Sequence, residues 1–170
     1  GGRKSVGGLE LYNFGVGGSR TEEWKTLSNA TGELLSTATG TANTRDISLI
    51  EIDTNDARPG GANLDAAAWK ANMSAIISTM QGVGSAILLI LSVNAPEGGA
   101  ITPERWDAYA DAAYELADQY NVALLDTRHL FAGWDAANAA GYGNGDALHL
   151  TPAGQWRQAE AIAALLYPLG

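Results

Sequence analysis

Apolar residues follow two different spacings along the chain, and these spacings predict strands and helices in alternation. Strand-like alternation or a short continuous apolar run occurs in four segments: Leu9–Phe14, Ile47–Asp53, Ser85–Val93 and Val122–Asp126. Ser85–Val93 is almost entirely aliphatic, which is typical of a central parallel strand that is covered on both faces.

Three longer segments place apolar residues at helical spacing, and we expect each to bury one face. Leu64–Met80 has its stripe at Trp69, Met73, Ile76, Ile77 and Met80. Thr102 caps the next helix, with Pro103 at its first position, and one face repeats Trp106, Ala110, Ala113, Leu116 or Ala117, and Tyr120. Thr151-Pro152 begins the last helix, whose predicted core face is Trp156, Ala159, Ala163 and Leu166. Thr21–Leu35 carries weaker helical signals.

The remaining segments are rich in Gly, Pro and small residues, and we expect loops there. They are residues 1–8, Ser36–Thr44, Thr54–Asn63, Asn94–Thr102 and Phe131–Gly145. The alternation of strands and helices predicts parallel strands joined by right-handed crossovers. We therefore expect one domain over residues 1–170, with a three-layer α/β/α fold and a mostly parallel sheet.

Composition narrows the classes of function. The chain has 170 residues, of which 46% are apolar, and ten basic against nineteen acidic residues give a net charge of −9. That balance argues against nucleic acid and anionic membranes as partners, since both attract a basic face. The longest apolar run, Ala86–Leu91, is far shorter than the roughly 20 residues of a membrane-spanning helix. The sequence contains no cysteine, which excludes disulfides, thiolate metal sites and a cysteine nucleophile.

The sharpest candidate chemistry is the pair Asp146 and His149, three residues apart on a short segment before the last helix. A carboxylate held against one imidazole nitrogen fixes the tautomer and leaves the other nitrogen to act as a base. The alternative is that His149 is a solvated loop residue and Asp146 an ordinary turn acid. For His129, the other histidine, we favour a structural role.

Two further candidates follow strands, where open α/β sheets bind their ligands. Asn55 could aim its amide at a developing oxyanion, although Asn-Asp pairs also simply form turns. Gly15–Gly18 is a glycine turn that could point a backbone N–H at a reacting centre, or only join a strand to a helix. It does not match a dinucleotide loop, because Arg20 stands where that motif needs glycine.

Together these segments resemble the SGNH (GDSL-type) serine hydrolases. The family's C-terminal Asp-x-x-His block matches Asp146–His149, and Leu150, Thr151 and Gly154 follow it in the family's manner. Its Gly-x-Asn-Asp block matches residues 53–56 except at the first position, and its glycine block matches residues 13–18. The resemblance spans essentially the whole chain and implies a flavodoxin-like architecture.

The resemblance also implies roles for individual residues. His149 would be the base and Asp146 its orienting acid, while the Gly18 N–H and the Asn55 side chain would be oxyanion donors. No metal or organic cofactor is implied.

The sequence departs from the family at two places. Asp53 replaces a glycine and puts a carboxyl beside the oxyanion region. The sequence also contains no Gly-Asp-Ser, the block that ends a central strand and carries the nucleophile. Ser5 and Ser19 are poorly placed as substitutes, so the nucleophile is unknown. We expect a segment upstream of residue 1 to supply it and to complete the sheet; another chain, or a rearranged inactive domain, are the alternatives.

The resulting expectation is a serine esterase that hydrolyses an ester or O-acetyl group, on a small molecule or glycan, through an acyl-enzyme. The alternative is a catalytically inactive module of the same fold that binds carbohydrate or serves a structural role. Such a module would belong to a secreted or phage-surface assembly, and a secreted or virion-associated location is the expectation for the domain in general.

Overall fold

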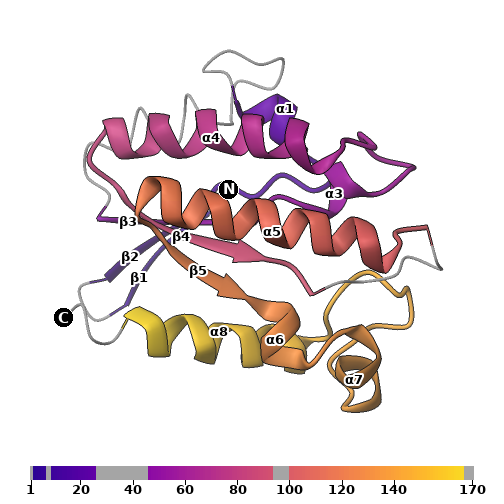
Figure 1. Ribbon diagram of the computed structural model, residues 1–170. Coiled ribbons are helices and arrows are strands. Elements are labelled where there is room, and N and C mark those ends of the chain that lie inside the picture. Colours follow the sequence, from indigo (N-terminus) through magenta and orange to yellow (C-terminus); the bar gives the residue numbers. More distant parts are fainter. Residues whose placement is uncertain (1, 7–8, 26–45, 94–99, 167–170) are drawn as a thin grey trace.

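A three-stranded parallel sheet forms the centre of the molecule (Figure 1). The computed structural model describes residues 2–6, 9–25, 46–93 and 100–166, with side chains from Asn13 onward within those ranges. The strands are β3 (Ile47–Ile50), β4 (Ala86–Leu91) and β5 (Ala123–Asp126), in the spatial order β3-β4-β5. All residues of β4 except Ala86 are buried, as expected for the central strand.

Helices cover both faces of this sheet. Helices α4 (Ala66–Gly82) and α5 (Pro103–Tyr120) lie together on one face, and α8 (Pro152–Leu166) lies on the other (Figure 1). The predicted three-layer α/β/α architecture is therefore confirmed. The main core lies between the α4–α5 layer and the sheet, and its largest fully buried side chains include Trp106, Tyr109, Met73 and Leu116.

Helices α4 and α5 each begin directly after a residue whose side chain accepts a hydrogen bond from one of the free N–H groups at the helix start. The Asp65 carboxylate accepts the N–H of Ala68 at 2.7 Å, and the Thr102 hydroxyl accepts that of Arg105 at 3.3 Å. Pro103 occupies the first turn of α5, as predicted. Both predicted helices are thus confirmed with boundaries that differ by one or two residues.

The N-terminal part differs from the prediction. Residues 2–6, expected to be loop, form strand β1 (Gly2–Val6), which pairs antiparallel with β2 (Leu9–Asn13). The strand predicted at Leu9–Phe14 is therefore present, but among the described residues its partner is β1 in a separate two-stranded sheet. Backbone pairing to a neighbouring strand overrides the loop preference of glycine-rich sequence.

In the described part of the chain, four short helices occupy the connections at the carboxyl ends of the strands. They are α1 (Thr21–Trp24), α3 (Thr54–Ala57), α6 (Thr127–Phe131) and α7 (Trp134–Ala139). The predictions of loop throughout Thr54–Asn63 and Phe131–Gly145 are therefore wrong in part. In α7 the reason is that alanine favours helix, and Trp134 and Ala137 bury themselves in a second apolar cluster.

Several predictions fall on parts of the chain outside the described residues. They are the continuation of the helical signal from residue 26 to Leu35, the loop at Ser36–Thr44, and residues 94–99 of the loop before Thr102.

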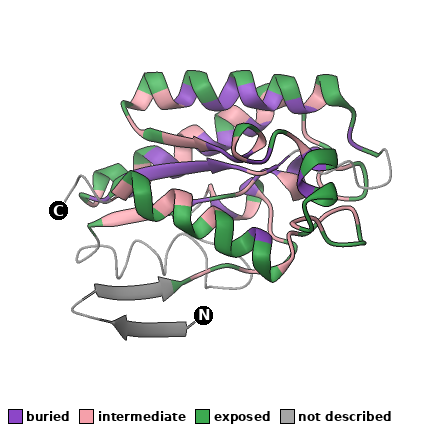
Figure 2. Ribbon diagram, turned by 90° about the horizontal axis from the view of Figure 1, so that it is seen from below, coloured by how far each residue is buried: buried purple, intermediate pink, exposed green. Residues whose placement is uncertain are grey.

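The core face predicted for α8 is wrong. Trp156 is 70% exposed, and Ala159 and Ala163 are exposed as well. The helix turns Gly154 and Gln158 toward the body of the protein instead. Figure 2 shows the buried central strand β4 beside helices whose outer faces are exposed.

None of the helices in the described ranges is both long enough and apolar enough to span a membrane.

Candidate functional site

The segment between α7 and α8 forms a tight turn that carries Asp146 and His149. Its two ends meet in an antiparallel bridge between Gly143 and Leu150, and the Asn144 N–H donates to the His149 carbonyl at 2.8 Å. Ala147 sits at the tip with a φ of 54°, a conformation that costs a residue other than glycine some strain. The backbone thus holds the two side chains on one side of the turn.

The Asp146 carboxylate accepts three hydrogen bonds within this turn. Oδ1 accepts the backbone N–H groups of Leu148 and His149 at 3.0 and 2.9 Å, and Oδ2 lies 2.6 Å from Nδ1 of His149. The bonds from the backbone and ring of His149, above all, lower the pKa of Asp146 to about 2. The acid is therefore ionised at neutral pH.

An ionised Asp146 determines the state of the imidazole. A carboxylate only accepts hydrogen bonds, so the proton of a neutral His149 ring must lie on Nδ1. Nε2 then carries the lone pair that can take up a proton, and the His149 side chain is 67% exposed. The pair predicted from sequence is brought together in the geometry of an oriented base.

The turn is held in place by apolar packing and by a close approach at the start of α8. Leu148 and Leu150 pack on a cluster of buried residues comprising Val93, Phe131, Trp134 and Ala137. A Cβ at Gly154 would lie 2.5 Å from the Tyr142 carbonyl oxygen, so only glycine fits there. The chain at His149 is thus held in place by the neighbouring residues Leu148 and Leu150 and, after His149, by Gly154.

The second pair of predicted residues, Asn55 and Gly18, is also brought together. Asn55 follows β3 within α3, and its Nδ2 donates to the carbonyl of Ser19, the residue after Gly18, at 3.2 Å. Gly18 has a φ of 77°, which favours glycine. The Asn55 carbonyl accepts the N–H of Ala62 at 2.9 Å, which fixes the backbone of this segment.

Both pairs lie at the end of the molecule where the parallel strands finish, as Figure 1 shows for α3 and for the segment between α7 and α8. Within the described residues no hydrogen bond joins the Asn55–Gly18 pair to the Asp146–His149 pair. They occupy the same edge of the sheet as two separate groups.

Asp53, the departure noted in the sequence, points its carboxyl at the end of β4. Oδ2 accepts the N–H of Ser92 at 2.7 Å and Oδ1 accepts the Thr54 hydroxyl at 3.0 Å. The residue is 3% exposed, and this burial raises the pKa of its carboxyl. Its hydrogen-bond capacity is therefore directed at the protein rather than toward Asn55.

Glu51 belongs to the same region and was missed by the sequence reasoning. Its Oε1 accepts the Ser92 hydroxyl at 3.1 Å, and its Oε2 accepts Nε2 of Gln158 in α8 at 3.0 Å. Desolvation of this carboxyl and the nearby Asp53 charge raise the pKa of Glu51 to about 7, even though the residue keeps an exposed side. The sequence signal that could have identified Glu51 is the position of an acidic residue at the end of an apolar strand.

His129 belongs to a different cluster. Its Nδ1 lies 2.9 Å from Oδ2 of Asp126, and the same carboxylate accepts hydrogen bonds from Tyr114 and Arg128. Asp126 also caps α6 through the N–H of Arg128. The bond from Tyr114 to Asp126 ties α5 to the end of β5. The His129 side chain is 77% exposed, and its structural role stays a prediction.

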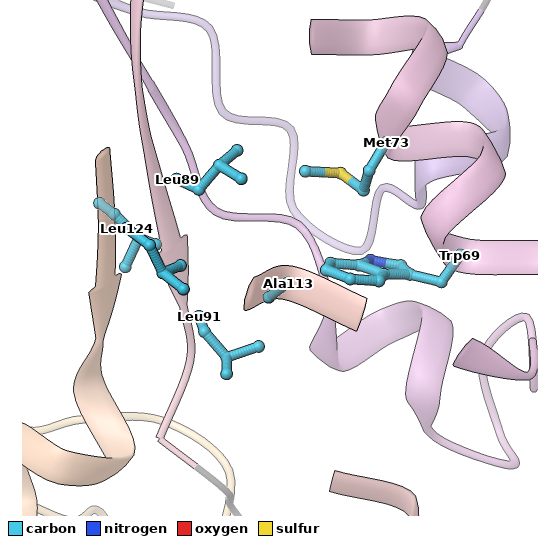
Figure 3. Close-up of a pocket in the computed structure, with 7 residues that line it drawn as sticks. Trp69, Met73, Leu89, Leu91, Ala113 and Leu124 are labelled. Atoms are coloured by element: carbon cyan, nitrogen blue, oxygen red, sulfur yellow. The ribbon is translucent and has the colours of Figure 1, made fainter. Parts of the chain in front are cut away.

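A small cavity lies in the core, away from these residues. Figure 3 shows Trp69 and Met73 of α4 facing it, together with Leu89, Leu91, Ala113 and Leu124. Its volume is about 10 Å³ and its lining is apolar, so it is a packing void too small for an organic substrate. No group of three or more side chains suited to binding a metal ion occurs in the described part of the chain.

Comparison with known proteins decides the family. A family model described as the GDSL-like lipase/acylhydrolase family matches residues 3–157. The chain belongs to this family. A search of curated proteins found no match.

Solved structures of similar fold agree with that membership. A lipase/acylhydrolase from Enterococcus faecalis has a TM-score of 0.66 and 15% identity, over 88% of this chain and 71% of that one. A structure of TesA has a TM-score of 0.59 and 20% identity, over 79% and 68%. A protein from Bacillus subtilis has a TM-score of 0.66 and 20% identity, over 91% and 44%.

At these identities the neighbours establish the fold, and the family model establishes the GDSL-like lipase/acylhydrolase membership. Membership supports an esterase or hydrolase activity in general.

Proposed function

We propose that this chain carries the acid–base and oxyanion machinery of a serine esterase that cleaves an ester or O-acetyl group through an acyl-enzyme. The observation that carries the proposal is the hydrogen bond between Nδ1 of His149 and the ionised Asp146. A base oriented by an acid is of use to an enzyme that must move a proton, whereas a binding module has no need of it.

The proposed reaction runs in two halves. The base, Nε2 of His149, takes the proton of a serine hydroxyl as the serine oxygen attacks the ester carbonyl. The resulting imidazolium, stabilised by Asp146, returns the proton to the leaving alcohol as the carbon–oxygen bond breaks. Water then attacks the acyl-serine in the same way, and the products are the free acid and the regenerated serine.

The oxyanion of each tetrahedral intermediate needs donors that are already in place. The Asn55 amide nitrogen carries two N–H groups, and its bond to the Ser19 carbonyl orients the group while engaging only one of them. We assign the second N–H, with the backbone N–H of Gly18, to the oxyanion.

The serine is proposed to come from a segment upstream of residue 1. Among the described residues, β3 pairs with β4 on one side, and no strand pairs with its other side. Leu49 of β3 is 50% exposed. A parallel strand added at this edge would cover apolar surface, and its carboxyl end would arrive beside the segment that carries Asn55.

A short acyl group on a carbohydrate is the proposed substrate. The alternative function, an inactive carbohydrate-binding or structural module, is favoured by the carboxyl of Asp53 beside the oxyanion region. The bonds of that carboxyl to Ser92 and Thr54, which direct it away from Asn55, reduce this objection.

The deciding experiment measures hydrolysis of p-nitrophenyl acetate by the protein of the longer reading frame. We expect His149→Ala to lower kcat/KM by about 100-fold or more, because general base catalysis contributes about that much. His129→Ala is the matched control, since His129 also contacts an aspartate but lies in the structural cluster at α6. Equal rates for wild type and His149→Ala would exclude the proposed mechanism.

The source of the nucleophile needs its own test. A fluorophosphonate that reacts with activated serines, followed by mass spectrometry of the labelled peptide, identifies the residue. We expect the label on a serine upstream of residue 1. A label on Ser5 or Ser19 would refute the proposed source while leaving the esterase assignment intact.

A further inference from the structure

Helix α8 determines where His149 lies, because the turn that carries His149 leads directly into Pro152 at the start of this helix. Yet α8 buries little of its own surface. Gly154 is its single buried residue among the described ones, Leu165 is 43% exposed and Trp156 is 70% exposed. The start of α8 is therefore held by close backbone packing at Gly154, and apolar burial contributes little along the rest of the helix.

A polar contact holds the helix further along. Gln158 lies four residues, or about one turn, beyond Gly154 and points the same way. Its side-chain amide donates to Oε2 of Glu51 at 3.0 Å, across 107 positions of sequence. Glu51 comes directly after β3, only four residues before Asn55.

The other oxygen of Glu51 reaches the neighbouring strand. Oε1 accepts the hydroxyl of Ser92, and the N–H of Ser92 in turn donates to the buried Asp53. Glu51 thereby links three elements: the end of β3, the end of β4 and the inner face of α8. These are the elements that present Asn55 and, through the start of α8, His149.

We propose that Glu51 is a positioning residue: by joining Gln158 to Ser92 it fixes α8, and with it the His149–Asp146 turn, relative to the Asn55 segment. The inference rests on the proposed function, in which His149 and Asn55 act on the same ester group. Glu51 itself touches none of the reacting atoms in this scheme.

The chemistry of the contacts distinguishes positioning from a charge effect. Both groups that face the carboxyl, the Ser92 hydroxyl and the Gln158 amide, are neutral donors, and the nearby charged group is Asp53, also acidic. A glutamine at position 51 can accept from Gln158 through its oxygen and donate to the Ser92 oxygen through its nitrogen. A leucine has similar size and can do neither.

The test compares Glu51→Gln, Glu51→Leu, Gln158→Leu and the double variant Glu51→Leu/Gln158→Leu. The first readout is the NMR signal of the His149 ring in the 170-residue chain, which requires no catalysis. We expect Glu51→Leu and Gln158→Leu to shift or broaden that signal to a similar degree, the double variant to add nothing, and Glu51→Gln to preserve the wild-type signal. Arg157→Leu, on the exposed side of the same helix, is the control.

The second readout is hydrolysis by the longer protein. Misplacement of His149 is expected to lower kcat about ten- to a hundredfold in Glu51→Leu with KM little changed, and Glu51→Gln is expected to restore most of the rate. An unchanged His149 signal in Glu51→Leu would refute the positioning role. A His149 signal in Glu51→Gln that differs from the wild type as much as in Glu51→Leu would refute it as well. Neither result depends on whether the esterase proposal holds, which the His149→Ala measurement decides separately.

Discussion

The side-chain amide of Asn55 donates to the carbonyl oxygen of Ser19 at 3.2 Å, which joins the segment after β3 to the glycine turn after β2. These segments lie 36 positions apart in sequence, so the contact depends on the fold as a whole. It gives Asn55 a fixed orientation without using up both of its N–H groups. An amide held in this way can donate to a developing negative charge with little reorganisation.

Asn55→Ala removes the proposed oxyanion donor. We expect kcat for p-nitrophenyl acetate to fall about 100- to 1,000-fold with little change in KM, because the lost interaction belongs to the transition state. Steady-state kinetics of the longer protein provide the measurement, with Gln81→Ala on the exposed side of α4 as the control. A change confined to KM would show that Asn55 binds the ground state instead.

We expect the Asp53→Asn variant to become more stable relative to the wild type as the pH rises. Burial raises the pKa of Asp53 in the folded state, so the unfolded chain ionises first, and the wild type loses stability as the pH increases from about 4 toward the raised value. Each unit of that rise corresponds to about 1.4 kcal/mol. Asparagine can keep a hydrogen bond to Ser92 and to Thr54 while it removes the titration.

Urea unfolding of wild type and Asp53→Asn between pH 4 and pH 8 measures this effect. The difference in the free energy of unfolding should grow with pH and then level off. A difference that stays constant over this range would mean that the Asp53 carboxyl titrates as it does in the unfolded chain.

Asp146 should titrate in the opposite sense. Its pKa is lowered to about 2 by the hydrogen bonds from His149, so its contribution to the turn is complete above about pH 4 and is lost as the pH falls toward 2. The backbone amide signals of Leu148 and His149 should report this transition in an NMR titration. In Asp146→Asn the same signals should show no transition in that range, and a wild-type midpoint near 4 would contradict the hydrogen-bonded geometry.

Gly154→Ala and Gly82→Ala form a matched pair in two helices. A Cβ at Gly154 would meet the Tyr142 carbonyl at 2.5 Å, whereas at Gly82 no atom lies within 4 Å. We expect Gly154→Ala to destabilise by about 1–3 kcal/mol and to disturb the His149 ring signal. Gly82→Ala should be neutral or stabilise by up to about 1 kcal/mol. Chemical unfolding of both variants tests the contrast, and equal effects would disprove it.

The sequence is most informative where the determinants are local. The strand predicted at Ser85–Val93 is present as β4 (Ala86–Leu91), shorter by one residue at its start and two at its end, and Thr102-Pro103 starts α5 as expected. The contact between Asp146 and His149 spans three residues, and one turn suffices to form it. The general rule that functional residues follow strands in open α/β sheets selected both Asn55 and the glycine turn. It does not explain their contact, because β2 pairs with β1 in a separate sheet.

The errors arise where distant contacts decide. The apolar spacing in α8 predicts the face of Trp156 and Ala159, whereas the face toward the protein carries Gly154 and Gln158, and Gln158 contacts Glu51 far away in the sequence. The same contact explains why Glu51 was overlooked, since its partners are Ser92 and Gln158, 41 and 107 positions away. Strand β1 was missed because glycines flank its short sequence, and it forms by backbone pairing with β2.

The outer side of β3 has a practical consequence for work with this polypeptide. Among the described residues β3 pairs with a strand on one side only, at β4, and its Leu49 is half exposed. An edge strand of this kind is a site where another extended backbone can pair. Samples of the 170-residue chain should therefore self-associate as their concentration increases, and dilution series by light scattering belong beside every spectroscopic measurement made on it.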